Sequence, residues 1–315
     1  MKKLNLSAIA LVAAAVAAPA FAQSSVTLYG RLNTSIENQK FDGQSRKWVV
    51  ANNASRLGFK GVEDIGGGLK ASFNLEHGLS SDNGAAAGTF WGREAWVQLS
   101  GDFGAVRLGN FTPESYFATA DYISMHNHDT GTSSDALYGF DTYRSSNKVG
   151  YFTPSFGGLS GSLSVSAGEG AAGQKRLYDL AVNYVSGPLH LGFGYADHDQ
   201  KSQWAARALV EMGAVTLGGY VQRDDVGPAT RTVYRLAAMY TLGASEFHVN
   251  YGRSGQAKAG NTVYVDKGAQ WTLGYNYNLS KRTRVYVHYT DLDTAKSARN
   301  NGEFSALITG VRHNF

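Results

Sequence analysis

Apolar and polar side chains alternate along most of this chain with a period of two residues. In the run from Gln270 to Leu279, Trp271, Leu273 and the two tyrosines that follow are separated by Thr, Gly and Asn residues. Successive side chains of a β-strand point to opposite faces, so such a run predicts a strand with one apolar and one polar face. The sequence therefore predicts an all-β protein.

About sixteen runs of this kind follow one another, bounded by residues that favour turns. They cover residues 26–37, 53–62, 68–77, 90–100, 103–110, 146–154, 159–167, 176–186, 189–197, 203–213, 214–223, 232–242, 245–253, 267–279, 283–292 and 303–315. Short connections such as Gly101-Asp102 alternate with longer polar ones, and no helical pattern covers the apolar faces. The simplest solution is a closed antiparallel barrel with lipid outside and water inside, because about sixteen strands leave an aqueous lumen.

A soluble β-sandwich would also show alternation. It would rarely carry tyrosines at both ends of its apolar face, as Tyr178 and Tyr184 do in one run and Tyr234 and Tyr240 in another. Aromatic residues at both ends are typical of membrane-spanning strands. No stretch after residue 22 approaches the roughly 18 consecutive apolar residues of a membrane helix. A transmembrane β-barrel is therefore favoured.

The first 22 residues have the pattern of a secretory signal peptide. Lys2 and Lys3 precede an apolar stretch at 4–18, and Ala20-Phe21-Ala22 provides a cleavage site after Ala22. We expect a signal peptide at 1–22 and one barrel domain at 23–315. The formal net charge of +4 includes both lysines, so the mature chain is close to neutral, which argues against a nucleic-acid partner. There is no cysteine, so ladder hydrogen bonds and lipid must hold an exported chain together.

Several motifs, taken in order, resemble the Gram-negative general porins, and most closely their trimeric β-proteobacterial branch. They are VTLYGR at 26–31, SRLGFKGVED at 55–64, LSGDFGAVRLG at 99–109, SNKVGY at 146–151 and GVRHNF at 310–315. The resemblance spans the whole mature chain. It implies a homotrimer in the outer membrane, surrounded by lipid and lipopolysaccharide, through which small hydrophilic solutes and ions diffuse passively. It implies no enzyme activity and no cofactor. It also implies that the barrel assembly machinery recognises the terminal Phe315.

The resemblance also implies where the channel is narrow. In these porins the third loop folds into the lumen, and the matching segment here runs from Thr112 to about Tyr143. Its acidic residues are Glu114, Asp121, Asp129, Asp135 and Asp141, of which Asp121 and then Glu114 are the leading candidates for the constriction. The resemblance puts basic wall residues at Arg31, Arg56, Arg93 and Arg144, and strand phase adds Lys60, which shares a face with Arg56. A field between wall and loop would filter solutes by charge, and we expect a mild preference for anions.

Two departures bear on this expectation. Asn110 stands where many relatives carry an arginine. In the run at 90–100, an inward Arg93 would send Glu94, Trp96 and Gln98 outward, and a carboxylate facing lipid is costly. Those outward residues would fit a subunit interface; otherwise the phase is reversed and Arg93 does not face the lumen.

Other chemistry is weaker. His126 and His128 have a spacing found in metal sites, but one such pair on a polar loop is a weak signal. His190, His248 and His288 lie in different predicted strands, and no serine is matched to them as a nucleophile would be. The main alternative to a channel is a plugged barrel with a structural or adhesion role.

Overall fold

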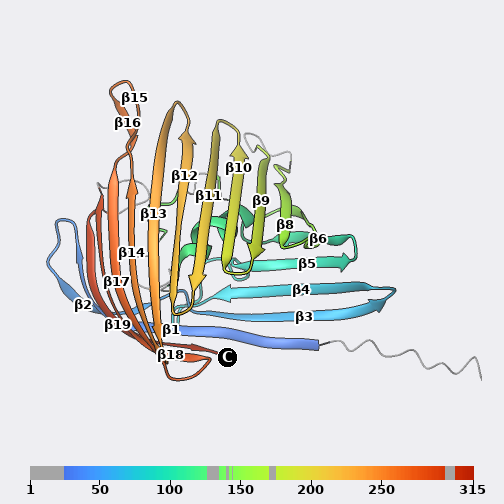
Figure 1. Cartoon of the computed structure of the whole chain (residues 1–315), viewed down its shortest axis with the longest axis horizontal. Helices are drawn as coiled ribbons and strands as arrows, with labels where there is room; N and C mark the ends of the chain where they lie inside the picture. Colours follow the sequence, from blue (N-terminus) through green and yellow to red (C-terminus); the bar gives the residue numbers. More distant parts are fainter. Residues whose placement is uncertain (1–24, 126–134, 140–141, 144, 170–174, 295–301) are drawn as a thin grey trace, which may run out of the picture.

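The wall of the protein is a single curved sheet (Figure 1). The computed structural model describes residues 25–125, 135–139, 142–143, 145–169, 175–294 and 302–315. Its strands are β1 (Ser25–Phe41), β2 (Lys47–Asn52), β3 (Arg56–Gly66), β4 (Leu69–Gly78), β5 (Glu94–Gly101), β6 (Gly104–Asn110), β7 (Lys148–Phe152), β8 (Leu159–Ser166), β9 (Leu177–Ser186), β10 (Leu189–His198), β11 (Lys201–Met212), β12 (Val215–Val226), β13 (Ala229–Leu242), β14 (Ser245–Ser254), β15 (Ala257–Ala259), β16 (Thr262–Val265), β17 (Gly268–Asn278), β18 (Thr283–Thr294) and β19 (Phe304–Asn314). Two short helical turns, α2 (Glu114–Tyr116) and η2 (Phe117–Asp121), lie between β6 and β7.

The sheet closes into a sixteen-stranded antiparallel barrel, because β1 pairs with β19. Each strand otherwise pairs with its neighbours in sequence, apart from the β15–β16 hairpin, which forms its own small sheet between β14 and β17. Strands β2 and β3 both pair with β1 and together form one strand of the wall. They are separated at Ala54, whose φ of 54° lies in the left-handed region and interrupts the ladder. All sixteen predicted runs are strands, while β2 and the hairpin were not predicted.

The wall carries apolar side chains on its outer face and polar side chains on its inner face, the reverse of a soluble protein. On β13, Leu236 points outward and is 70% exposed, whereas its neighbour Arg235 points inward and is 1% exposed. Arg235 donates to Asn250 of the adjoining strand β14 and to Gln270 of β17, the strand beyond it. Polar groups are thus hydrogen-bonded on the inside and apolar groups line the outside, as a wall between lipid and water requires.

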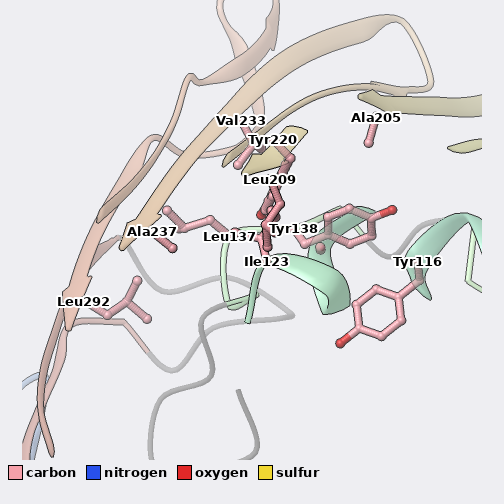
Figure 2. Close-up of a cluster of buried hydrophobic side chains, with 11 residues drawn as sticks. Tyr116, Ile123, Leu137, Tyr138, Ala205, Leu209, Tyr220, Val233, Ala237 and Leu292 are labelled. Carbon is pink, nitrogen blue, oxygen red and sulfur yellow. The ribbon is translucent and has the colours of Figure 1, made fainter. Parts of the chain in front are cut away.

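One apolar patch interrupts the polar inner face. Leu209, Tyr220 and Val233, on β11, β12 and β13, are buried together with Ile123 and Tyr138. The last two come from the segment between β6 and β7, which lies against this part of the wall (Figure 2). The patch holds the segment against the wall by burying apolar area.

Within the described residues, no helix combines the length and the apolar character that crossing a membrane requires.

Candidate functional site

One cavity of the structure has a volume of about 1140 Å³. It is bounded by the wall on one side and by residues of the β6–β7 segment on the other. Among the described residues, six arginines and four carboxylates line it: Arg31, Arg56, Arg93, Arg107, Arg284 and Arg312, with Glu76, Glu94, Asp121 and Asp135. The lining therefore carries an excess of two positive charges when all ten groups are ionised.

Four of the arginines form a continuous row, which we call the arginine arc: Arg284, Arg312, Arg31 and Arg56. They lie on the neighbouring strands β18, β19, β1 and β3. Arg284 is directly opposite Arg312 in the ladder, and Arg31 is directly opposite Arg56. Like charges in directly opposed positions destabilise a sheet. Partners on the wall offset part of this cost, since Arg284 lies 3.5 Å from Glu246 and Arg31 donates to Asn314, and the four guanidinium groups concentrate positive charge on this part of the wall.

The structure brings three of the five predicted wall cations to the cavity. Arg31, Arg56 and Arg93 line it, and Arg31 also donates to Asn314 at 3.1 Å. Lys60 lies on β3 four residues beyond Arg56 and is not among the lining residues; its ammonium group sits over the Tyr29 ring, 5.1 Å from the centroid. Arg144 lies outside the described residues.

We expected that an inward Arg93 would require Glu94, Trp96 and Gln98 of β5 to point outward, and this expectation is wrong. Glu94 and Trp96 line the cavity, while Val97 is exposed on the outer face. Arg93 nevertheless reaches the same cavity, because β5 begins only at Glu94 and the preceding residue is free of the strand's alternation. Its Nε atom lies 2.5 Å from Oε1 of Glu76. With Glu94 turned inward, the outer face of β5 no longer carries the polar residues that suggested a subunit interface.

The two candidate acids of the loop have different surroundings. Asp121 lines the cavity at the end of η2. Glu114 is half-buried, and its Oε1 atom lies 3.7 Å from the Arg107 guanidinium. Burial raises the pKa of Glu114 to about 7, although Arg107 and Lys148 act in the opposite direction. Asp129 and Asp141, like His126 and His128, lie outside the described residues.

Asp179 of β9 anchors the start of the β6–β7 segment. Its Oδ1 atom accepts the backbone N–H groups of Glu114 at 2.9 Å and Ser115 at 3.2 Å, and its Oδ2 atom accepts the Ser115 hydroxyl. The free N–H groups of a helical turn are natural partners for a carboxylate. The backbone approaches the wall closely, since a Cβ at Gly194 would come within 2.6 Å of the Ser115 carbonyl oxygen. This close approach explains the glycine on β10.

Two further anchors hold the segment. Arg207 of β11 donates to the Ala118 carbonyl at 2.9 Å, and its guanidinium lies 3.6 Å from the centre of the Tyr122 ring. Gln222 of β12 accepts from the Gly139 N–H and donates to the Gly139 carbonyl. Hydrogen bonds therefore fix the segment to the wall both near its start, at Ala118, and farther along, at Gly139. Both contacts lie beside the apolar patch of Figure 2.

Sequence reasoning missed half of the cavity's arginines, namely Arg107, Arg284 and Arg312. Their inward phase could have been read from the alternation of their strands. Arg107 is surrounded by aromatic rings, 4.2 Å from the centre of Trp96 and 4.4 Å from that of Phe152. Arg107 therefore lines the cavity and also packs against aromatic rings near the start of the β6–β7 segment.

The end of the chain closes the barrel. Phe315 exchanges two backbone hydrogen bonds with Gly30, each 3.1 Å long, and its ring lies where a side chain at position 30 would be. Recognition of Phe315 by the assembly machinery stays a prediction. Ala22 and the expected cleavage site lie outside the described residues.

Comparisons with known proteins agree with this architecture. The family model described as "Gram-negative porin" matches residues 8–297. Outer membrane porin protein 32 of Delftia acidovorans is 34% identical, with 91% of this chain and 88% of that protein covered. The solved anion-selective porin from Comamonas acidovorans is 28% identical and has a TM-score of 0.77, with 93% of this chain and all of that chain covered. OmpT of Vibrio cholerae, solved in a trimer form, is 18% identical and has a TM-score of 0.71, with 93% and 99% covered.

Proposed function

The chain belongs to the Gram-negative porin family and is a passive channel of the outer membrane, and we propose that its cavity is a charge filter that favours anions. Proteins of this family are channels rather than enzymes. Small hydrophilic solutes and ions would cross the lumen down their gradients, between the arginine arc and the β6–β7 segment. The segment would form the constriction, with Asp121 on its surface and Glu114 behind it.

The arginine arc is the observation that carries the proposal. Arginine keeps its charge at any physiological pH, so the arc provides a fixed positive potential. Carboxylates at the cavity engage protein groups: Glu76 pairs with Arg93, Glu94 accepts from Thr112 and Trp96, and Asp135 accepts from Tyr116. Within the arc, Arg284 lies 3.5 Å from Glu246. A passing anion would meet four cations on neighbouring strands, and such a field concentrates the opposite charge. The anion-selective solved porin, similar over its whole length, supports this sign.

Conductance of the purified protein in a planar bilayer tests the proposal. We expect discrete open channels and, under a KCl gradient, a zero-current potential whose sign corresponds to chloride permeating faster than potassium. A cation-selective potential would mean that the loop carboxylates dominate. A protein that inserts but conducts nothing would instead support the plugged structural or adhesion barrel.

We also propose that three copies assemble into a homotrimer, with lipid and lipopolysaccharide around the outer wall. The trimer form of the solved OmpT, which shares this fold, supports the oligomer. The exposed apolar side chains that cover the outer face support contact with lipid.

The selectivity should depend on pH through Glu114. Because its pKa is near 7, lowering the pH from 8 to 6 neutralises one carboxylate beside the cavity, while the arginines stay charged. The lumen then becomes more positive, so the chloride-to-potassium permeability ratio should rise as pH falls. One charge acting over roughly 10 Å of water is worth about 0.4 kcal/mol, which corresponds to a change of about twofold.

Zero-current potentials between pH 8 and 6 measure this change, and Glu114→Gln is the control. At both pH values the variant should have a ratio close to that of the wild type at pH 6, and it should lose the dependence. A wild-type ratio that does not change across this range would contradict the role given to Glu114.

A further inference from the structure

The β6–β7 segment presents apolar side chains to the cavity as well as charged ones. Phe117, Met125 and Tyr143 all line it, and the Phe117 and Tyr143 side chains are 39% and 40% exposed. Asp121 lies four residues after Phe117 and lines the same cavity. The Phe117 and Tyr143 rings pack against the Tyr116 ring, with centroids 6.1 and 5.9 Å away, and their exposed parts are open to a solute in the cavity. The charge filter alone gives these rings no role.

The arginine arc lines the same cavity. Guanidinium groups are planar and weakly hydrated, and they stack on aromatic faces besides pairing with carboxylates. The inner face of this barrel already contains such stacking, since Arg107 lies over Trp96 and Arg207 over Tyr122. A solute with both a carboxylate and an aromatic ring could therefore interact with guanidinium groups through its charge and its ring.

We propose that the cavity contains a binding site for monocyclic aromatic carboxylates, which this channel admits in preference to non-aromatic carboxylates of equal size and charge. The carboxylate would lie on the arginine arc, and the ring would contact Phe117 and Met125 of the opposite face. The inference rests on the proposed function and names the solute class of that channel. It predicts saturable binding, which a purely electrostatic filter would not show at the same concentrations.

Single-channel recordings with benzoate test the site, with cyclohexanecarboxylate as the non-aromatic match. Added to KCl, benzoate should reduce the chloride current in a saturable manner, at concentrations about two- to fivefold below those needed for cyclohexanecarboxylate. This range corresponds to about 0.5–1 kcal/mol for stacking on an exposed cation or ring. Under gradients of the two sodium salts, benzoate should also show the higher permeability.

Phe117→Leu should remove most of the difference between the two anions, and Phe117→Tyr should keep it. Phe156→Leu is the matched control, because Phe156 is 68% exposed and is not among the lining residues; it should behave as the wild type. Equal effects of both anions on the wild type, or an unchanged preference in Phe117→Leu, would overturn the aromatic site. Chloride-selective KCl currents in the same recordings would show that the charge filter stands even if the aromatic site fails.

Discussion

Replacing the arginine arc with glutamine, in the variant Arg31→Gln/Arg56→Gln/Arg284→Gln/Arg312→Gln, is expected to convert the channel from anion-selective to cation-selective. Six arginines and four carboxylates line the cavity of the wild type, so two arginines would then face four carboxylates. Each lost charge contributes about 0.4 kcal/mol at roughly 10 Å in water before salt screening. Four together should change the permeability ratio by about three- to tenfold, enough to reverse the sign of a mild preference.

The zero-current potential in a KCl gradient measures the reversal. A matched control removes four cations that do not line the cavity: Arg223, Arg253, Lys281 and Arg282, each replaced by glutamine. The control should keep the sign of the wild type. If both variants stay anion-selective, the selectivity arises elsewhere in the channel and the arc is not the filter.

The same variant separates functional from structural arginines. Arg31 faces Arg56 and Arg284 faces Arg312 across the ladder, so their removal relieves like-charge repulsion. The variant also loses the Arg284–Glu246 ion pair and the Arg31–Asn314 hydrogen bond, which offset that gain, so its thermal midpoint should stay close to that of the wild type even though its selectivity is reversed. A large loss of stability would mean that these side chains hold the wall together.

The strands could be predicted from the sequence because lipid and water impose opposite demands on alternate residues. Strand β2 departs from this pattern, since Trp48, Val49 and Val50 are three consecutive apolar residues, of which Trp48 and Val50 are the exposed ones. The β15–β16 hairpin lies outside the wall and is too short to show any period. The strands whose side chains alternate were therefore predicted. Strand β2, which breaks the alternation, and the hairpin, which lies outside the wall, were not.

The site was only partly predictable, for a geometric reason. Alternation tells which face a residue occupies, but neither its height along the strand nor its neighbours across the closing seam. Arg312 and Arg31 lie far apart in the sequence yet on adjacent strands, because β19 pairs with β1. Lys60 has the predicted phase but stands four residues from Arg56, away from the cavity. Only the register of the closed sheet places the four arginines side by side.

The phase of β5 shows a second limit of sequence reasoning. A strand pattern was extended to Arg93, which in the structure precedes the strand. The apolar patch at Leu209, Tyr220 and Val233 is a third limit. The inner face of a water-filled barrel is expected to be polar, so buried apolar residues there are explained only once the segment that covers them is known. The patch depends on how the β6–β7 segment is placed, and the irregular backbone of that segment has no period from which its placement could be derived.

Releasing the β6–β7 segment should have the second large effect. In Asp179→Ala/Gln222→Ala the segment loses three hydrogen bonds to the Asp179 carboxylate and two to the Gln222 amide. Hydrogen bonds to a charged group contribute about 1.5–3 kcal/mol each and neutral ones about 1 kcal/mol. Their loss should let the segment leave its position often, while the wall persists, since each strand keeps its ladder pairing.

We expect this variant to show a larger mean conductance, more open-channel noise and a weaker anion preference, because solutes then pass farther from the arginine arc. Single-channel recordings measure all three. The matched control, Asp197→Ala/Gln256→Ala, removes the same residue types from positions bonded to Tyr195 and to Asp266, and it should conduct as the wild type does. If conductance and noise do not change when both anchors are absent, the segment does not set the width of the channel. Selectivity would then have to come from the arginine arc acting across an open lumen.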